Sequence, residues 1–389
     1  MKQVVLVLNY LAVFCLLLSY LAPYIDPNSF WPIAFFGLFY PFFFCVNLLF
    51  ILFWVFMRKK YLWLSFLAIS IGYSFFFRFI SLNENDDEFA AENRRSITVL
   101  SYNVRLFDRY NWINNQNEVT RLKVIDSIKT IDPGILCIQE FFNSDSDNPP
   151  SLIALNTKQA LENVHAEYTV SNGPYHWGIA TFSKYPIIEE GIVGFESKSN
   201  NICIYSDIDL GGDTLRVYNA HLGSILFDYD DYELIKSVFR KIGGTEIKNR
   251  DSSGSLSLSL KRRGIGVREI AVIPVLKNVF FRLKRAFKKR SAQALAISSH
   301  ISDSPYPVLL CGDFNDTPIS YSYSEIIRNN LQDAFLESGI GLGMTYIGAF
   351  PSFRIDYILH SKSIISKRFR TMSSNTLSDH YPLICEIVL

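Results

Sequence analysis

The sequence lacks the features of a zinc protein, and it lacks a large net charge of either sign. Its six cysteines form no C-x-x-C pair and no Cys/His spacing typical of a zinc site. Four of them lie singly in strand-like apolar runs, where a thiol serves as a small apolar side chain: Cys137, Cys203, Cys311 and Cys385. The chain has 38 lysines and arginines against 37 aspartates and glutamates, so it is not basic throughout.

Charged residues are also missing from three long apolar stretches in the first 80 residues, and the first charged residue within these stretches is Arg78. The stretches cover residues 4–21, 30–56 and 61–80, and each holds roughly the 20 apolar residues that a helix needs to cross a bilayer. A cleaved signal peptide followed by buried helices is the alternative. Three stretches in succession favour a three-helix transmembrane anchor over residues 1–80, with a polar linker at 81–96.

The basic residues beside these stretches predict an orientation. Lys2 and residues 58–60 lie on one side of the predicted membrane, and the first loop carries Asp26 without lysine or arginine. The positive-inside rule then places the N-terminus in the cytoplasm and the C-terminal domain outside it. Arg78 and residues 94–95 argue against this, as do the unpaired cysteines, which suit a reducing compartment. We expect an integral inner or plasma membrane protein with an extracytoplasmic domain.

After residue 96 the composition becomes that of a soluble α/β (α+β) domain. The segment 117–131 has apolar residues on one helical face and ends at 132–134, Asp-Pro-Gly. Buried strands are predicted at 97–103, 135–139, 178–183, 201–210, 214–220, 307–312, 355–360 and 382–388. Short strands mixed with a few helices predict a layered domain over residues 97–389.

An insertion at about 225–290 interrupts this pattern. Residues 243–264 are rich in serine and glycine, and residues 261–290 carry a net charge of +10. The segment 271–290 mixes apolar and basic residues, so it is either an amphipathic helix on an anionic surface or a solvated helix. Because the positive charge is confined to this segment, nucleic acid is a possible partner but not a favoured one.

Polar residues gather at the ends of the predicted strands. They are Asn103, Glu140, His221, Asp313, Asn315, Asp356, Asp379 and His380. Each alone is explained by a turn or a cap. Asp356 is harder to explain, because a carboxylate between Ile355 and Tyr357 in a strand needs a partner, and a histidine is a natural one. A single site of oxygen ligands and two histidines accounts for the whole set.

Carboxylate and carboxamide oxygens without thiols suit a hard cation such as Mg²⁺ or Mn²⁺. Such an ion polarises a phosphoryl oxygen, and an imidazole transfers protons near neutral pH. Metal-assisted hydrolysis of a phosphoester is the chemistry that these residues fit.

In order, the motifs SYNV, IQE, NAHL, GDFND, RIDYI and SDHYP resemble those of the endonuclease/exonuclease/phosphatase superfamily, in a membrane-anchored, bacterial-type member. The resemblance implies a DNase I-like four-layer sandwich, with two packed β-sheets, outer helices and the site at one end. It also implies that Asn103 and Glu140 hold the Mg²⁺ or Mn²⁺ ion and that Asp379 lies close to it.

The same resemblance implies the catalytic roles. Asp313 and Asn315 position the attacking water and the phosphate. His380 contacts the phosphate and pairs with Asp356. His221 stabilises the transition state or assists the leaving group.

The substrate stays open at this point. One hypothesis is a membrane-anchored phosphodiesterase or phosphatase that acts on a lipid headgroup or another small phosphoester. A second is a nuclease that uses the basic segment to bind phosphates. A third, of another class, is a non-enzymatic membrane-binding module with this fold. The expected partners are the phosphoester and the lipid bilayer, and the sequence predicts no protein partner.

Overall fold

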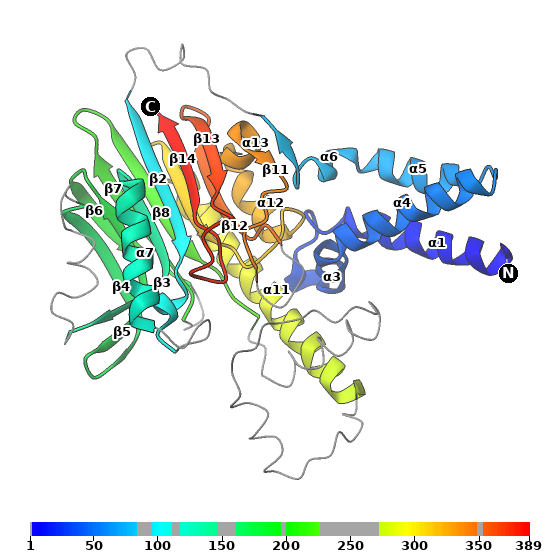
Figure 1. Ribbon diagram of the computed structural model, residues 1–389, viewed down its shortest axis with the longest axis horizontal. Coiled ribbons are helices and arrows are strands. Elements are labelled where there is room, and N and C mark those ends of the chain that lie inside the picture. Colours follow the sequence, from blue (N-terminus) through cyan, green and yellow to red (C-terminus); the bar gives the residue numbers. More distant parts are fainter. Residues whose placement is uncertain are drawn as a thin grey trace, which may run out of the picture. The chain divides into compact units, whose positions relative to one another are not determined.

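A computed structural model describes residues 2–83, 95–110, 117–145, 161–195, 200–225, 272–347 and 353–389 (Figure 1). The chain divides into two compact units, Ile225–Ala286 and the remainder. The larger unit contains the apolar N-terminal helices and two six-stranded sheets.

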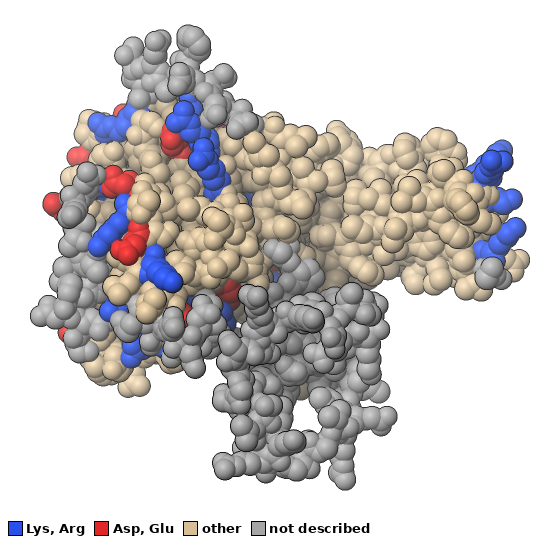
Figure 2. Space-filling view, in the orientation of Figure 1, with Lys and Arg blue, Asp and Glu red and all other residues tan. Residues whose placement is uncertain are grey.

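The apolar N-terminal residues form six helices. They are α1 (Lys2–Ser19), α2 (Pro27–Phe30), α3 (Pro32–Leu38), α4 (Tyr40–Phe56), α5 (Leu62–Ile71) and α6 (Tyr73–Phe76). Within the described residues, α1 is the one helix that is by itself long and apolar enough to cross a membrane. Helices α3 and α4 pass the same test together, but they meet at 63°. In Figure 2 the visible surface of these helices carries no charged residues along most of its length, and lysine and arginine appear at the end far from the sheets.

The expectation of three transmembrane helices is therefore wrong in its count. Pro41 is the second residue of α4 and has no N–H to bond to the preceding turn, so the stretch 30–56 breaks at Phe39. Gly72 ends α5 after 10 residues, which span about 15 Å, half of the hydrocarbon thickness. A hydropathy pattern reports only how apolar a stretch is, so it does not predict where a helix within that stretch ends.

Two mixed sheets follow. The strands of the first, in spatial order, are β13 (Ile365–Thr371), β14 (Leu383–Val388), β2 (Ser96–Asn103), β3 (Ile135–Ser144), β5 (Tyr175–Ser183) and β4 (Asn163–Asn172). Those of the second are β10 (Leu331–Asp333), β12 (Asp356–Ser361), β9 (Val308–Asp313), β8 (Thr214–His221), β7 (Ile202–Asp209) and β6 (Ile187–Ile192). The pairs β2–β3 and β8–β9 are parallel, and the other neighbours are antiparallel.

Successive side chains of a strand point to opposite faces of its sheet, so each sheet packs on the other sheet with one face and on helices with the other. Val99 and Cys137 point into the core between the sheets, together with Leu309 and Cys311 of the second sheet. The alternate residues of β2 and β3 pack outward, on α7 (Asn117–Ile131). On the other side, α11 (Val272–Ser302) and α12 (Tyr321–Ile327) pack on β8, β9 and β12. The expected architecture of two packed sheets with outer helices is confirmed (Figure 1).

The segments around the predicted linker and insertion differ in part from expectation. Ser81–Leu82 forms a short strand, β1, that pairs with β11 (Ile340–Gly341), so the chain is already attached to the sandwich there. Residues 84–94 and 226–271 lie outside the described residues. The basic segment predicted at 271–290 is helical from Val272 onward, as the first part of α11.

Candidate active site

Three of the predicted residues lie in register across neighbouring strands of the second sheet. Asp356 starts β12 and pairs with Asp313 at the end of β9, and Asp313 in turn pairs with His221 at the end of β8. Their side chains therefore meet at one end of the sheet. All three are at most 9% exposed, so their charges act on one another through little solvent.

Gly312 explains how β9 approaches β8 so closely at this point. A Cβ atom on Gly312 would lie 2.0 Å from the carbonyl oxygen of Ala220 in β8. A side chain here would force the two strands apart, and with them His221 and Asp313.

The first sheet supplies Asn103 and Glu140. Asn103 ends β2 beside Gln139 of β3, and its Nδ2 donates to Oδ2 of Asp313 at 3.0 Å, across the two sheets. Glu140 sits where the register between β3 and β5 shifts, with a φ of 49°. Such a bulge re-aims a side chain, and a left-handed non-glycine residue is typical of functional sites. Nδ2 of Asn103 also lies 3.4 Å from Oε1 of Glu140.

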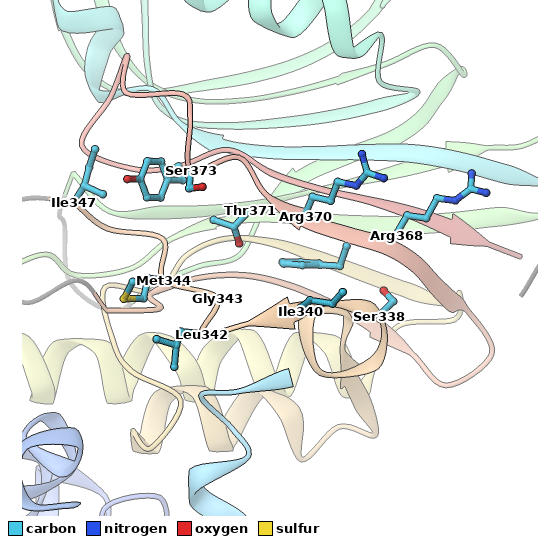
Figure 3. A pocket seen from close by; sticks show the side chains of 12 residues that line it. Ser338, Ile340, Leu342, Gly343, Met344, Ile347, Arg368, Arg370, Thr371 and Ser373 are labelled. Carbon is cyan, nitrogen blue, oxygen red and sulfur yellow. The ribbon is translucent and has the colours of Figure 1, made fainter. Parts of the chain in front are cut away.

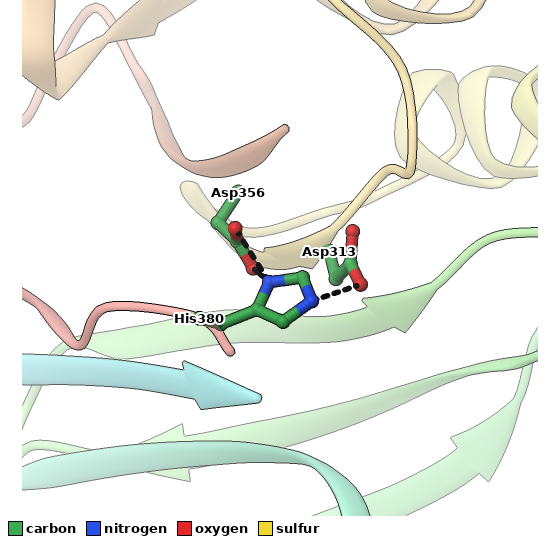
Figure 4. Close-up of side chains that lie close together, drawn as sticks. All are labelled: Asp313, Asp356 and His380. Carbon is green, nitrogen blue, oxygen red and sulfur yellow. Dashed lines mark hydrogen bonds and ion pairs between the residues drawn. The ribbon is translucent and has the colours of Figure 1, made fainter. Parts of the chain in front are cut away.

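The two histidines converge on one carboxylate. His380 lies between the two aspartates: its Nδ1 is 2.9 Å from Oδ2 of Asp356, and its Nε2 is 3.8 Å from Oδ2 of Asp313 (Figure 4). Nε2 of His221 is 3.8 Å from the same oxygen of Asp313. That Nε2 is buried and has no hydrogen-bond partner among the described residues. The histidine that a buried Asp356 requires is therefore His380.

Burial and charge separate the protonation states of the two histidines. Burial alone would lower the pKa of His380, but the charges of Asp356 and Asp313 outweigh it and raise that pKa to about 10. Burial lowers the pKa of His221, and the positive charge of His380 adds to this effect. Near neutral pH the site thus holds one imidazolium and one neutral imidazole.

Asp313 is central to the site and carries a perturbed carboxyl group. Burial and the charge of Asp356 raise its pKa to about 6. Asn315 follows in the left-handed conformation, with a φ of 53°, and its backbone N–H donates to Oδ1 of Asp313 at 2.8 Å. Its side chain donates to the carbonyl of Leu222 at 3.1 Å, which ties the GDFND turn to the end of β8.

Two groups of residues could hold a cation. One is Asp313, Asp356 and His380, whose potential ligand atoms all lie within 4.8 Å of one another. There, however, both ring nitrogens of His380 face carboxylates, and the protonated ring would repel a cation. The other is Glu140 with Asp379. Burial and the charge of Asp379 raise the pKa of Glu140, so a cation beside the two carboxylates would relieve their repulsion.

The structure brings together all the residues that the sequence predicts for the site. Seven are linked by the contacts above. Asp379 joins them through its charge on Glu140 and through Arg105, whose Nε lies 3.5 Å from Oδ2 of Asp379.

Three further contacts were not predicted. Oγ1 of Thr345 accepts from the backbone N–H of Asp356 at 3.1 Å, and the ring of Tyr346 lies 5.1 Å from that of His380. Gln139 donates to Oδ1 of Asn219 at 2.7 Å, a buried bond between the sheets. The polar ends of the motifs IQE and NAHL pointed to this last pair, whereas nothing in the local sequence marks Thr345 or Tyr346.

Two packed mixed sheets, outer helices and a carboxylate–imidazole site at one end define the class: a DNase I-like sandwich. Residues 100–380 match the model of the endonuclease/exonuclease/phosphatase family, and the chain belongs to this family. Residues 2–79 match a second family model, described as a domain of unknown function (DUF8431). A search of curated proteins gave no match.

Solved structures that resemble this chain include bacterial and human proteins. A family protein from Bacteroides thetaiotaomicron is 18% identical, with a TM-score of 0.47, over 76% of this chain and 99% of that one. One from Leptotrichia buccalis C-1013-b is 15% identical, with a TM-score of 0.46, over 74% and 98%. The catalytic domain of human Nocturnin is 16% identical, with a TM-score of 0.47, over 76% and 97%.

Proposed function

We propose that the protein is a membrane-anchored, divalent-metal-dependent phosphoester hydrolase. One observation carries this proposal: Nε2 of His221 and Nε2 of His380 each lie 3.8 Å from the same oxygen of Asp313. A phosphoryl group bound next to this oxygen would contact the protonated imidazole of His380, the neutral imidazole of His221 and the carboxylate of Asp313. The buried Nε2 of His221, which has no partner in the described residues, supports a ligand there.

The residues present fit a hard cation. Glu140 and Asp379 would hold Mg²⁺ or Mn²⁺ together with the side-chain oxygen of Asn103. When bound, such an ion polarises a phosphoryl oxygen and stabilises the negative charge that develops on it.

The other side chains act on water, phosphate and leaving group. Asp313 accepts the proton of the attacking water, and Asn315 orients that water and the phosphate. His380, kept protonated by Asp356, donates from Nε2 to a phosphoryl oxygen. His221 hydrogen-bonds the phosphoryl or leaving-group oxygen through its Nε2. Arg105 pairs with Asp379 and orients that carboxylate.

A cleft beside the site supports an amphiphilic substrate, such as a phospholipid. It has a volume of about 610 Å³ (Figure 3), and the residues that line it include Tyr381, which directly follows His380 in the chain. Much of its lining is apolar: Ile340, Leu342, Met344, Ile347, Phe369 and Tyr381. The backbone N–H of Ile347, which lines the cleft, donates to the carbonyl of Asp379 at 2.8 Å, so the cleft adjoins the segment that carries Asp379 and His380. Arg368 and Arg370 also line the cleft, so it offers positive charge for a phosphate next to an apolar surface for an acyl chain.

The apolar helices support the membrane part of the proposal. Helix α1 is of spanning length, and 22% of its most apolar 18-residue window is buried within the protein. The remaining apolar surface would be covered by lipid. To place the catalytic domain outside the cytoplasm, the orientation predicted from Lys2 and residues 58–60 needs a third span after residue 60, and α5 covers only about half of the hydrocarbon thickness.

The test uses the full-length protein in detergent micelles. Hydrolysis of a phospholipid, plasmid DNA, inositol phosphates and an aryl phosphodiester would be followed with Mg²⁺, Mn²⁺ and EDTA. We expect metal-dependent turnover that His380→Ala abolishes, with the phospholipid as the best substrate. Fastest cleavage of DNA would favour the nuclease, and metal-independent or absent turnover would favour the binding module.

A further inference from the structure

The segment 316–320 directly follows the predicted catalytic Asn315, and the N-terminal helices contact it. Ile319 is fully buried in an apolar cluster formed otherwise by helix and loop residues from the first 80 positions, among them Leu16, Ala22 and Ile33. The apolar core of the N-terminal helices is therefore completed by a residue four positions after Asn315.

Arg78, just after α6, fixes the same segment by hydrogen bonds. Its Nη1 donates to the carbonyl of Pro318 at 3.0 Å and to Oγ of Ser324 at 3.1 Å. Its own carbonyl accepts from Nη2 of Arg354 at 2.8 Å, and Nη1 of Arg354 is bonded to Asp333 at 2.6 Å. The guanidinium of Arg78 thus faces the protein and not a lipid headgroup.

Gly37 shows how closely α3 lies against this segment. A Cβ atom there would be 2.9 Å from the carbonyl oxygen of Ile319 and 2.5 Å from Cβ of Ala22. Only glycine allows this approach of backbone to backbone.

From Pro318 the contacts continue into the site. Oδ2 of Asp316 accepts from Nε of Arg290 at 3.0 Å, and its carbonyl accepts from Oη of Tyr357 at 2.8 Å. Nη1 of Arg290 also donates to the carbonyl of Gly223 at 3.0 Å, two residues after His221. The segment is therefore held on one side by the sandwich and on the other by the N-terminal helices.

We propose that the N-terminal helices are a positioning element of the active site as well as an anchor. Through Arg78 and Ile319 they fix the segment 316–320, and this sets the positions of Asp313 and Asn315. Arg78 reaches no reacting atom, so it is a positioning residue. The inference rests on the proposed function, since it assigns Asp313 and Asn315 to the reaction.

The test is Arg78→Gln in the full-length protein in detergent micelles. We expect kcat for the best phosphoester to fall about tenfold while KM stays within about twofold, because a misplaced group lowers the rate more than the binding of substrate. Arg78→Lys, which keeps one donor for Pro318, should recover part of kcat. Exchange of the backbone amides of Asn315 and Thr317 should become about fivefold faster in Arg78→Gln, because the N–H of Thr317 bonds to Asp316 within this segment and that of Asn315 bonds to Asp313 just before it.

Arg58→Gln is the matched control. Arg58 lies in the turn after α4, and among the described residues its side chain has no hydrogen bond to the sandwich. The Arg58→Gln variant should keep the kcat and the amide exchange rates of the wild type. Equal kcat and equal exchange in Arg78→Gln and wild type would overturn the inference.

A milder variant keeps the inference testable if Arg78→Gln does not fold. Ile319→Val removes one methylene from the cluster and should lower kcat about threefold with faster exchange at Asn315. Absence of turnover by the wild type on every phosphoester would overturn the proposed function instead. In that case the amide exchange alone decides whether the helices hold the segment.

Discussion

Nδ1 of His380 lies 2.9 Å from Oδ2 of Asp356, and this contact joins the start of β12 in the second sheet to the segment that leads into β14 of the first. Asp356 begins β12 of the second sheet, and His380 lies three residues before β14 of the first. Their ion pair therefore joins the two sheets at the site. It also sets the charge of the site, since the carboxylate keeps the imidazole protonated.

Asp356→Asn removes the charge that raises the pKa of His380. In the wild type that pKa is about 10, so a reaction that needs the imidazolium loses rate as the pH rises through this value. In the variant the alkaline limb should lie at lower pH, and kcat at pH 9 should fall by about 100-fold. The measurement is kcat against pH with saturating Mg²⁺.

Asp213→Asn, at an exposed turn, is the control and should keep the profile of the wild type. An alkaline limb that does not move in Asp356→Asn would show that His380 does not act as the imidazolium.

Asp313→Asn should stabilise the protein while it abolishes turnover. The pKa of Asp313 rises from 3.8 to about 6 on folding, so the neutral form is preferred in the folded state. The stability that comes with a raised pKa is fully present below about pH 4 and is lost as the pH rises through about 6. The ionised carboxylate therefore costs about 3 kcal/mol above pH 6, which the neutral asparagine avoids.

Urea unfolding in metal-free buffer measures this effect. At pH 8 the variant should be about 1–3 kcal/mol more stable than the wild type, and the difference should disappear as the pH falls to 4. A variant that is less stable than the wild type at pH 8 would contradict the assignment of a strained, buried charge.

The central strands and the site were predictable from the sequence, and the edge strands were not. Strands such as β2, β3, β8, β9 and β12 are buried on both faces, so they appear as continuous apolar runs. Within the two six-stranded sheets, the four strands that the sequence did not predict, β4, β6, β10 and β13, are the four edges. An edge strand buries less of its surface, and β6 carries Glu189 and Glu190 in a six-residue strand.

The site residues were predictable because each is a polar residue within or next to an apolar, strand-like run. A carboxylate or a histidine directly after an apolar run is conspicuous, as Asp313 is after Val308–Cys311. Thr345 and Tyr346 precede no such run, so only the fold brings them to Asp356 and His380. The contact of Arg78 with Pro318 joins residues 240 positions apart, and no local pattern encodes it.

Glu140→Gln should weaken metal binding more than it weakens catalysis at saturating metal. Burial and the charge of Asp379 raise the pKa of Glu140, and a bound cation removes this repulsion. Without the carboxylate, the Mg²⁺ concentration for half-maximal turnover should rise at least about tenfold. Glu189→Gln, exposed on β6, should leave it unchanged. Equal Mg²⁺ dependence in Glu140→Gln and the wild type would place the ion elsewhere.

A buried polar cluster should stabilise the N-terminal helices. Oδ1 of Asn9 in α1 accepts from Nε1 of Trp54 in α4 at 2.9 Å, and its Nδ2 donates to Oγ of Ser65 in α5 at 2.7 Å. All three side chains are at most 1% exposed. In Asn9→Leu the indole N–H would lose its acceptor, which should cost about 1 kcal/mol.

A double-mutant cycle with Trp54→Phe isolates the Asn9–Trp54 term. Phenylalanine has no N–H to leave unpaired, so Asn9→Leu should cost about 1 kcal/mol less in the Trp54→Phe background than in the wild type. Unfolding by SDS titration of the full-length protein in mixed micelles provides the four free energies. Equal costs in the two backgrounds would mean that the Asn9–Trp54 bond does not stabilise the packing of α1 on α4.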